Sequence, residues 1–190
     1  GYIRIDSFKD NTPEQFQAIY GKLIQDGAKA LVFDLRDNGG GLVRSLEKVL
    51  DPLMPEGDIA VATYRDGTTR TLVTSDAEEC DLPMAVLVNG NTASAAELFA
   101  ASLHDFGKGK VVGTTTFGKG IMQNTQQLPN GGALTLTVAK YRTVRGECYH
   151  GVGITPDVEV EAGEEKVEYD NPDSKTDPQL AAAIQTVSEQ

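Results

Sequence analysis

The chain has 190 residues, 39% of them hydrophobic, and a formal net charge of −11. Its length suits one domain with a sizeable core. Apolar runs stay well short of the roughly 18 residues that a membrane-spanning helix needs. Basic residues do not cluster as a nucleic-acid surface requires. The composition therefore excludes an obvious membrane span and gives no sign of a nucleic-acid partner.

The acidity is concentrated near the C-terminus. Residues 157–177 hold nine acidic residues and two lysines, a sum of −7, whereas residues 1–156 hold 18 acidic and 15 basic residues, a sum of −3. Such a run is more typical of a solvated linker than of a binding tail. We predict a core domain over residues 1–158, an acidic linker over 159–177 and a terminal helix over 178–190.

The chain starts at Gly1 without an initiator methionine or a signal-peptide pattern. We expect a piece cut from a longer chain, so the compartment is not readable from composition. Cys80 and Cys148 lack the spacing of metal ligands, and either one disulfide or two free thiols fits the pattern. We expect no metal and no cofactor.

The first predicted helix carries clear start signals. It follows an opening strand that ends near Phe8, and it runs from about Pro13 to Asp26. Thr12 can cap it, and Gln15, three residues later, would complete a capping box. Pro13 suits the first helical turn.

Beyond this helix, strands alternate with helices. Two nearly continuous apolar runs, residues 30–35 and 83–88, predict strands that are covered on both faces. The other predicted elements are a helix over 42–50, a hairpin of strands 59–64 and 69–74 that turns at Asp66-Gly67, a helix over 94–105, a strand at 111–113, two strands that meet at 129–132, and a last helix over 178–187. This order predicts an α/β domain with a central, largely parallel sheet flanked by helices.

Ser94 lies where a buried strand passes through a loop of small and polar residues into a helix. A helix N-terminus offers free N–H groups and a positive partial charge, which would stabilise an alkoxide or an oxyanion. The stretch is compatible with a nucleophilic serine. Taken alone, it favours a serine that only caps the helix.

Lys119 lies between Gly118 and Gly120, so its backbone can approach another element closely. A lysine acts as a general base only when its amine is neutral, which requires burial or a nearby cation. The neighbours Phe117, Ile121 and Met122 could supply an apolar wall. Taken alone, the residue is more simply interpreted as a surface lysine.

A glycine turn follows the strand that ends at Asp34-Leu35-Arg36. Its backbone N–H groups, around Gly40 and Gly41, could hold an anion. The G-x-G-x-x-G spacing of a dinucleotide site is absent, so a nucleotide site is weakly supported. The turn is a reasonable wall of an oxyanion hole.

These stretches form an ordered set of motifs over almost the whole chain. The motifs are Gly1-Tyr2-Ile3-Arg4-Ile5, Asp34-Leu35-Arg36-x-Asn38-x-Gly40-Gly41, Asn89…Ala93-Ser94-Ala95-x-Glu97, Thr116-Phe117-Gly118-Lys119-Gly120-x-x-Gln123, Leu136-Thr137-x-Ala139-Lys140-Tyr141 and Gly153-Ile154-x-Pro156-Asp157. In this order and spacing they resemble the carboxy-terminal processing peptidases, also called tail-specific proteases.

The resemblance implies a crotonase/ClpP-like fold and a serine endopeptidase that cleaves unstructured C-terminal segments of proteins. It implies that Ser94 is the nucleophile, Lys119 the general base and Gln123 the residue that orients the lysine. For the oxyanion hole it implies the N–H groups of Ala95 and of Gly40 or Gly41.

The resemblance also implies partners and a location. Members of the family usually carry a PDZ domain and work outside the cytoplasm, so we expect a PDZ domain in the full-length chain and a periplasmic, membrane-anchored or secreted protein. We expect protein substrates that bind as extended strands at a sheet edge, and a homo-oligomer is compatible with the sequence. The chain departs from the family pattern near Gly39 and at Val144-Arg145-Gly146, where the family commonly has proline.

Three other interpretations stay open. A Ser-His pair could use His150, whereas His104 lies about 15 Å along the helix axis from Ser94 and cannot reach it. The chain could be a catalytically silent peptide- or ligand-binding domain on the same scaffold. A crotonase-type acyl-CoA enzyme is suggested by fold analogy alone.

Overall fold

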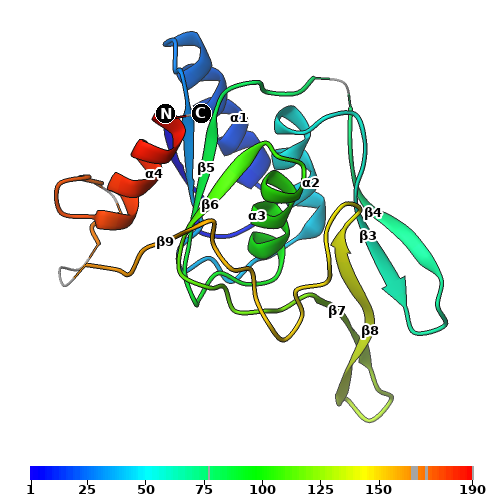
Figure 1. Ribbon diagram of the computed structural model, residues 1–190. Coiled ribbons are helices and arrows are strands. Elements are labelled where there is room, and N and C mark those ends of the chain that lie inside the picture. The colour runs from blue at the N-terminus through cyan, green and yellow to red at the C-terminus, as the bar shows by residue number, and fades with distance from the viewer. Residues whose placement is uncertain (77, 164–166, 170, 190) are drawn as a thin grey trace.

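The computed structural model describes residues 1–76, 78–163, 167–169 and 171–189. They form a five-stranded parallel sheet in the order β1-β2-β5-β6-β9, with helices on both faces (Figure 1). Its strands are β1 (Tyr2–Arg4), β2 (Leu31–Asp34), β5 (Met84–Val88), β6 (Gly109–Gly113) and β9 (Val158–Glu159). The helices are α1 (Thr12–Gln25), α2 (Val43–Leu50), α3 (Ala95–Asp105) and α4 (Pro178–Ser188), with a 3₁₀ turn at Asp51–Leu53. The predicted α/β class and central parallel sheet are confirmed.

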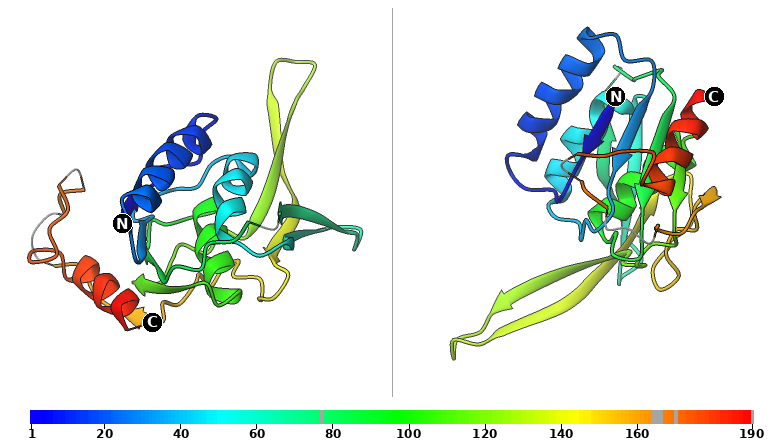
Figure 2. Two further views of the ribbon diagram at one scale, coloured as in Figure 1. Left: turned by 90° about the horizontal axis from the view of Figure 1, so that it is seen from above. Right: turned by 90° about the vertical axis from the view of Figure 1, so that its left-hand side faces the viewer.

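The central strands are buried on both faces, as their apolar runs predicted. Every residue of β5 is buried. Because successive side chains of a strand point to opposite faces, Val86 and Val88 join the core with α1, α2 and α3. Leu87 and Val32 instead pack with residues of α4 on the other face. The C-terminal helix therefore covers one side of the sheet (Figure 2).

A second sheet is antiparallel, in the order β4-β3-β8-β7. Its strands are β3 (Gly57–Tyr64), β4 (Thr69–Ser75), β7 (Ile121–Gln127) and β8 (Ala133–Thr143). The sequence predicted two separate strand pairs, and pairing of Ala62 with Tyr141 joins them into one sheet. The outer part of the β7–β8 ribbon projects from the body of the molecule (Figure 2).

The predicted capping of α1 is wrong in detail. The helix begins at Thr12, and the N-cap residue is Asn11, which makes no side-chain cap hydrogen bond. The Thr12 hydroxyl instead accepts a hydrogen bond from the Lys9 N–H and donates one to the carbonyl oxygen of Ser7. The Thr12 hydroxyl is therefore bonded within the loop before the helix and does not form the predicted capping box with Gln15. Phe8 also lies beyond β1 and forms an isolated bridge with Gly41.

The acidic C-terminal stretch contacts the domain at several points. Strand β9 pairs with β6, and Tyr169 donates a hydrogen bond to Asp37. Asp177 forms an ion pair with the buried Arg36. The division into core, linker and helix stays a prediction.

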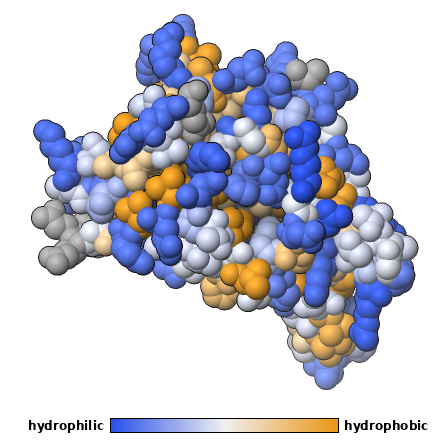
Figure 3. Space-filling model, in the orientation of Figure 1, coloured by the Kyte–Doolittle hydropathy of each residue, from blue (hydrophilic) through white to orange (hydrophobic). Residues whose placement is uncertain are grey.

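The face seen in Figure 1 is mostly hydrophilic, with small hydrophobic areas scattered over it (Figure 3). Among the described residues, no helix combines the length and apolar character that crossing a bilayer demands.

Candidate active site

Ser94 occupies a strained position between β5 and α3. It is the N-cap residue of α3, with φ 58° and ψ −120°. A non-glycine residue in this region costs about 1–3 kcal/mol and is typically found where the surrounding structure enforces it, often at functional sites. Nucleophilic serines on sharp strand-to-helix turns show this kind of geometry. The strain is an observation that the sequence did not predict.

Lys119 lies in the loop between β6 and β7 and is half-buried. Gly118 before it has φ +89°, and a Cβ there would lie 2.9 Å from the Gly153 nitrogen. The glycine therefore allows the close backbone approach that the sequence predicted. The apolar wall is only partly present, because Phe117 is 65% exposed whereas Met122 packs against the core.

Glu97, on the first turn of α3, joins the Ser94 and Lys119 segments. Its buried carboxylate accepts hydrogen bonds from the backbone N–H groups of Ser94 at 2.9 Å and Lys119 at 2.7 Å. It also accepts from the Gly118 N–H and the Thr116 hydroxyl, each at 2.6 Å. Four donors from two segments thus converge on one carboxylate, and buried polar groups satisfied in this way hold a unique arrangement.

Tyr141, on β8, contacts both segments from the other side. Its hydroxyl donates to the carbonyl oxygen of Lys119 at 2.7 Å and lies 3.3 Å from Ser94 Oγ. The hydrogen bonds of the described residues include none between Lys119 Nζ and Ser94 Oγ. Backbone and phenol contacts, rather than a direct bond between serine and lysine, hold the two residues near each other here.

The glycine turn after β2 packs directly against Ser94. Gly40 has φ +100°, and a Cβ there would lie 2.8 Å from the Ala93 oxygen and 2.9 Å from the Ala95 nitrogen. The Gly40 N–H already donates to Asn38 Oδ1 at 2.8 Å. Among the described residues, the N–H groups of Gly41 and Ala95 make no backbone hydrogen bond.

Gln123 lies on β7, four residues beyond Lys119, and is exposed. A register shift between Met122 and Gln123 interrupts the pairing with β8. Such bulges re-aim side chains, often beside active sites. Within the described part of the chain the Gln123 side chain makes no hydrogen bond, so its contact with Lys119 stays a prediction.

The two histidines take different positions. His104 lies in the last turn of the continuous helix α3, with Nδ1 2.8 Å from Asp105 Oδ1, away from Ser94 as predicted. His150 Nδ1 lies 3.2 Å from the carbonyl oxygen of Gly118. Both cysteines are free in the part of the chain that the structure describes. The described residues also include no cluster of His, Cys, Asp and Glu side chains able to hold a metal.

The side of the glycine turn away from Ser94 is covered by the C-terminal stretch. Arg36 is fully buried and pairs with Asp34 at 2.6 Å and Asp177 at 2.8 Å. Asp37 has φ +62° and accepts hydrogen bonds from Asn91 at 2.8 Å and from Tyr169 at 2.7 Å. The turn is therefore held by the Ser94 loop through Asn91 and by the C-terminal stretch through Tyr169 and Asp177.

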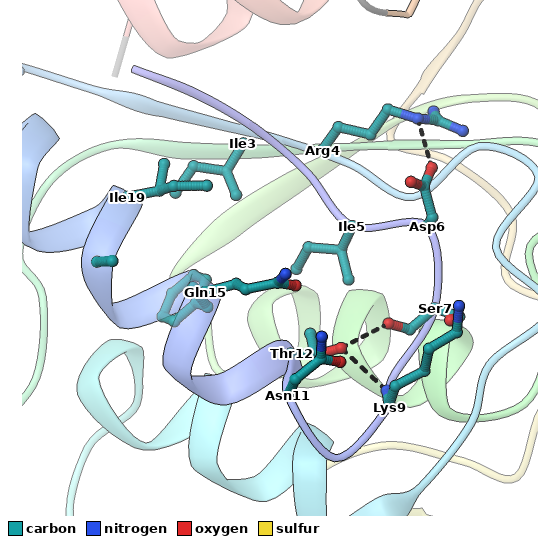
Figure 4. Close-up of a pocket in the computed structure, with 12 residues that line it drawn as sticks. Ile3, Arg4, Ile5, Asp6, Ser7, Lys9, Asn11, Thr12, Gln15 and Ile19 are labelled. Carbon is teal, nitrogen blue, oxygen red and sulfur yellow. Dashed lines mark hydrogen bonds and ion pairs between the residues drawn. The ribbon is translucent and has the colours of Figure 1, made fainter.

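A cavity of about 610 Å³ lies elsewhere, between β1 and α1. It is lined among others by Ile5, Gln15 and Ile19 (Figure 4). Neither Ser94 nor Lys119 lines it. The candidate site is thus defined by the convergence of three loops rather than by this cavity.

The sequence matches peptidase family S41 over residues 1–160. This chain belongs to peptidase family S41. It is 36% identical over 163 residues to the chloroplastic C-terminal processing peptidase of Tetradesmus obliquus, a match that covers 85% of this chain and 35% of the relative. It is 37% identical over 161 residues to the carboxyl-terminal-processing protease of Synechocystis sp., covering 85% of this chain and 38% of that protein. The family resemblance drawn from the motifs is confirmed.

Solved structures of the S41 family share the fold. The photosystem II D1 C-terminal processing protease superposes with a TM-score of 0.79 at 36% identity, covering 85% of this chain and 42% of that one. An S41 protease from Bacteroides fragilis superposes with a TM-score of 0.80 at 20% identity over 100% of this chain and 54% of the other, which shows the fold alone. The S41 chain described here thus spans about two fifths of the length of its similar relatives.

Glu97 and Tyr141 both lie within the sequence motifs, but the motifs predicted a role for neither. Glu97 had a usable signal, because a glutamate three residues after a serine at a helix start is a capping box pattern. Tyr141 had none, since its contact with Ser94 depends on how β8 packs against α3. Asp37 likewise gave no signal for its left-handed backbone.

Proposed function

We propose that this S41 chain carries the catalytic machinery of a serine endopeptidase of the C-terminal processing type. Ser94 is the nucleophile and Lys119 the general base. The observation that carries the proposal is the convergence of the strained Ser94, the Lys119 loop and the Gly40 turn, with Glu97 bonded to both of the first two. The names of its relatives support the substrate class, protein C-termini.

The reaction is acyl transfer. The neutral Lys119 amine takes the Ser94 proton as Oγ attacks the scissile carbonyl carbon, and the resulting ammonium returns that proton to the leaving amine. Water then hydrolyses the acyl-enzyme. Gln123 orients Lys119 once substrate is bound, when the dyad closes.

Two N–H groups hold the oxyanion. Ala95 at the start of α3 is one donor, where the helix dipole adds a positive partial charge. Gly41 is the second donor that we favour over Gly40, because the Gly40 N–H is already bonded to Asn38. Losing one such donor typically costs about 100- to 1000-fold in kcat.

The substrate binds as an extended strand at the free edge of β7. This strand is the outer member of its sheet and begins two residues after Lys119. An unpaired edge offers main-chain hydrogen bonds to a peptide of any sequence. As the family resemblance implies, the full-length protein carries a PDZ domain that delivers C-termini. The full-length protein works outside the cytoplasm. A homo-oligomer is compatible with this scheme.

The test is cleavage of an unstructured peptide with a free C-terminus. Ser94→Ala and Lys119→Ala should each abolish cleavage while the melting temperature stays within a few degrees of the parent protein. Lys22→Ala, which removes an exposed lysine on α1, is the matched control and should cleave normally. Full activity of Lys119→Ala would overturn the dyad, and peptide binding without cleavage by the parent protein would favour the silent binding domain.

A further inference from the structure

The phenol of Tyr141 sits between the two residues proposed as nucleophile and base. Its oxygen lies 2.7 Å from the carbonyl oxygen of Lys119 and 3.3 Å from Ser94 Oγ. The backbone N–H of Tyr141 also donates to the carbonyl oxygen of Gly120 at 3.1 Å. One residue of β8 therefore holds the Lys119 loop by main chain and side chain together.

The ring of Tyr141 has little freedom to leave this position. The residue is 4% exposed, and its ring packs edge-on against Tyr149 with centroids 6.1 Å apart. Burial raises the pKa of the Tyr141 phenol above its ordinary value, so the hydroxyl keeps its proton at neutral pH. Tyr141 thus acts as a fixed hydrogen-bonding group and leaves the Ser94 proton for Lys119.

Tyr141 and Glu97 hold the same two segments through complementary groups. Glu97 accepts from the N–H groups of Ser94 and Lys119, whereas Tyr141 contacts the side-chain oxygen of the first and the carbonyl oxygen of the second. The carboxylate fixes the backbones. Of these two side chains, the Tyr141 phenol is the one that contacts the reacting atom, Ser94 Oγ.

We infer that Tyr141 is a positioning residue of the dyad, which sets Ser94 Oγ and the Lys119 backbone relative to each other; this rests on the function proposed above. Reaction rates depend steeply on such placement, because the acceptor must lie within hydrogen-bonding reach of the proton it takes. Tyr141→Phe removes the oxygen and keeps the packed ring.

The experiment measures two rates in the same samples. One is labelling of Ser94 by a fluorophosphonate, located by peptide mass spectrometry, and the other is peptide cleavage resolved into kcat and KM. Tyr141→Phe should lower both the labelling rate and kcat by about three- to tenfold, the effect of one hydrogen bond, with KM unchanged. A purely structural role would not split kcat from KM in this way.

Tyr2→Phe is the matched control, since it removes a phenol bonded to Asp34 at 2.8 Å and away from Ser94. It should label and cleave as the parent protein does. Equal labelling rates for the parent protein and Tyr141→Phe would overturn the role of Tyr141 while leaving the dyad standing. A parent protein that is not labelled at Ser94 would overturn the proposed function and this inference with it.

Discussion

The carboxylate of Glu97 accepts a hydrogen bond from the backbone N–H of Lys119 at 2.7 Å, across the boundary between helix α3 and the loop after β6. The same carboxylate oxygen, Oε2, accepts from the N–H of Ser94. Ser94 and Lys119 are far apart in sequence, and the two hydrogen bonds to Glu97 fix the position of one backbone relative to the other. A small change at Glu97 should therefore disturb chemistry as well as stability.

We predict that Glu97→Gln lowers both activity and stability. An amide in place of one oxygen would face N–H donors and leave a buried donor unpaired, which costs about 2 kcal/mol of unfolding free energy. Displacement of Lys119 should lower kcat by about a hundredfold. Glu47→Gln is the control, because Glu47 also accepts two hydrogen bonds, from Thr74, but lies away from the site. Equal peptide cleavage by both variants would contradict the prediction.

The glycines of the turn after β2 should differ sharply in tolerance. Gly40→Ala places a Cβ within 2.9 Å of backbone atoms of the Ser94 segment at a φ of +100°, so we expect a loss of about 3 kcal/mol or more in unfolding free energy. Gly39→Ala meets nothing within 4 Å, and its unfolding free energy should change by less than about 1 kcal/mol. Denaturant titration of the two variants measures both. Comparable losses would show that the close approach at Gly40 is unimportant.

If the proposed dyad operates, activity should rise with pH, because a general base Lys119 must lose its proton before it accepts that of Ser94. The measurement is kcat/KM for a peptide from pH 5 to pH 10, in the parent protein and in His150→Ala. The histidine variant should retain the profile. A profile limited by a group near pH 6.5 that disappears in His150→Ala would instead identify histidine as the base.

The fold was predictable where burial leaves a pattern in the sequence. Strands β2 and β5 are covered on both faces, so nearly every residue in them is apolar and the runs are unambiguous. The union of the two hairpins into one sheet was not predictable, because the pairing of β3 with β8 depends on tertiary packing. The predicted cap of α1 was wrong because of a local contact: the loop before the helix already binds the Thr12 hydroxyl that would have capped it.

The sequence motifs predicted which residues form the candidate site, but they did not predict how those residues contact one another. Ser94, Lys119 and the Gly40 turn follow from motif order, and the structure brings Ser94 and Gly40 into contact. The hydrogen bonds of Glu97 and Tyr141 could not be predicted, because they depend on how distant segments pack together. The contacts of Tyr169 with Asp37 and of Asp177 with Arg36 could not be predicted, because an acidic composition does not reveal a buried partner.

Removal of Asp177 should destabilise the domain through Arg36. The guanidinium is fully buried between Asp34 and Asp177, and Asp177 also caps helix α4 through the Leu180 N–H at 3.0 Å. Asp34 still balances the charge of Arg36 in Asp177→Ala, but the buried guanidinium loses a hydrogen-bond acceptor and helix α4 loses its cap, so the variant should cost about 2–4 kcal/mol. Asp173→Ala is the control in the same stretch, because Asp173 is exposed and, among the described residues, its carboxylate accepts a hydrogen bond from the Lys175 N–H alone. Thermal melts compare them, and equal shifts would contradict the role of Arg36.

Asp37 should make stability depend on pH in acid. The hydrogen bond from Asn91, with those from Tyr169 and Asn89, lowers the pKa of Asp37 below its ordinary value of 3.8. A carboxylate with a depressed folded-state pKa stabilises the protein above the unfolded pKa, and this contribution is lost as the pH falls through the folded value. The stability gap between the parent protein and Asp37→Asn should therefore be full at pH 7 and shrink below about pH 4. Denaturant titrations at pH 7 and pH 3 measure the gap, with Asp10→Asn correcting for the loss of one surface acid. A gap that stays constant between the two pH values would mean that the Asp37 carboxylate does not hold the turn through its charge.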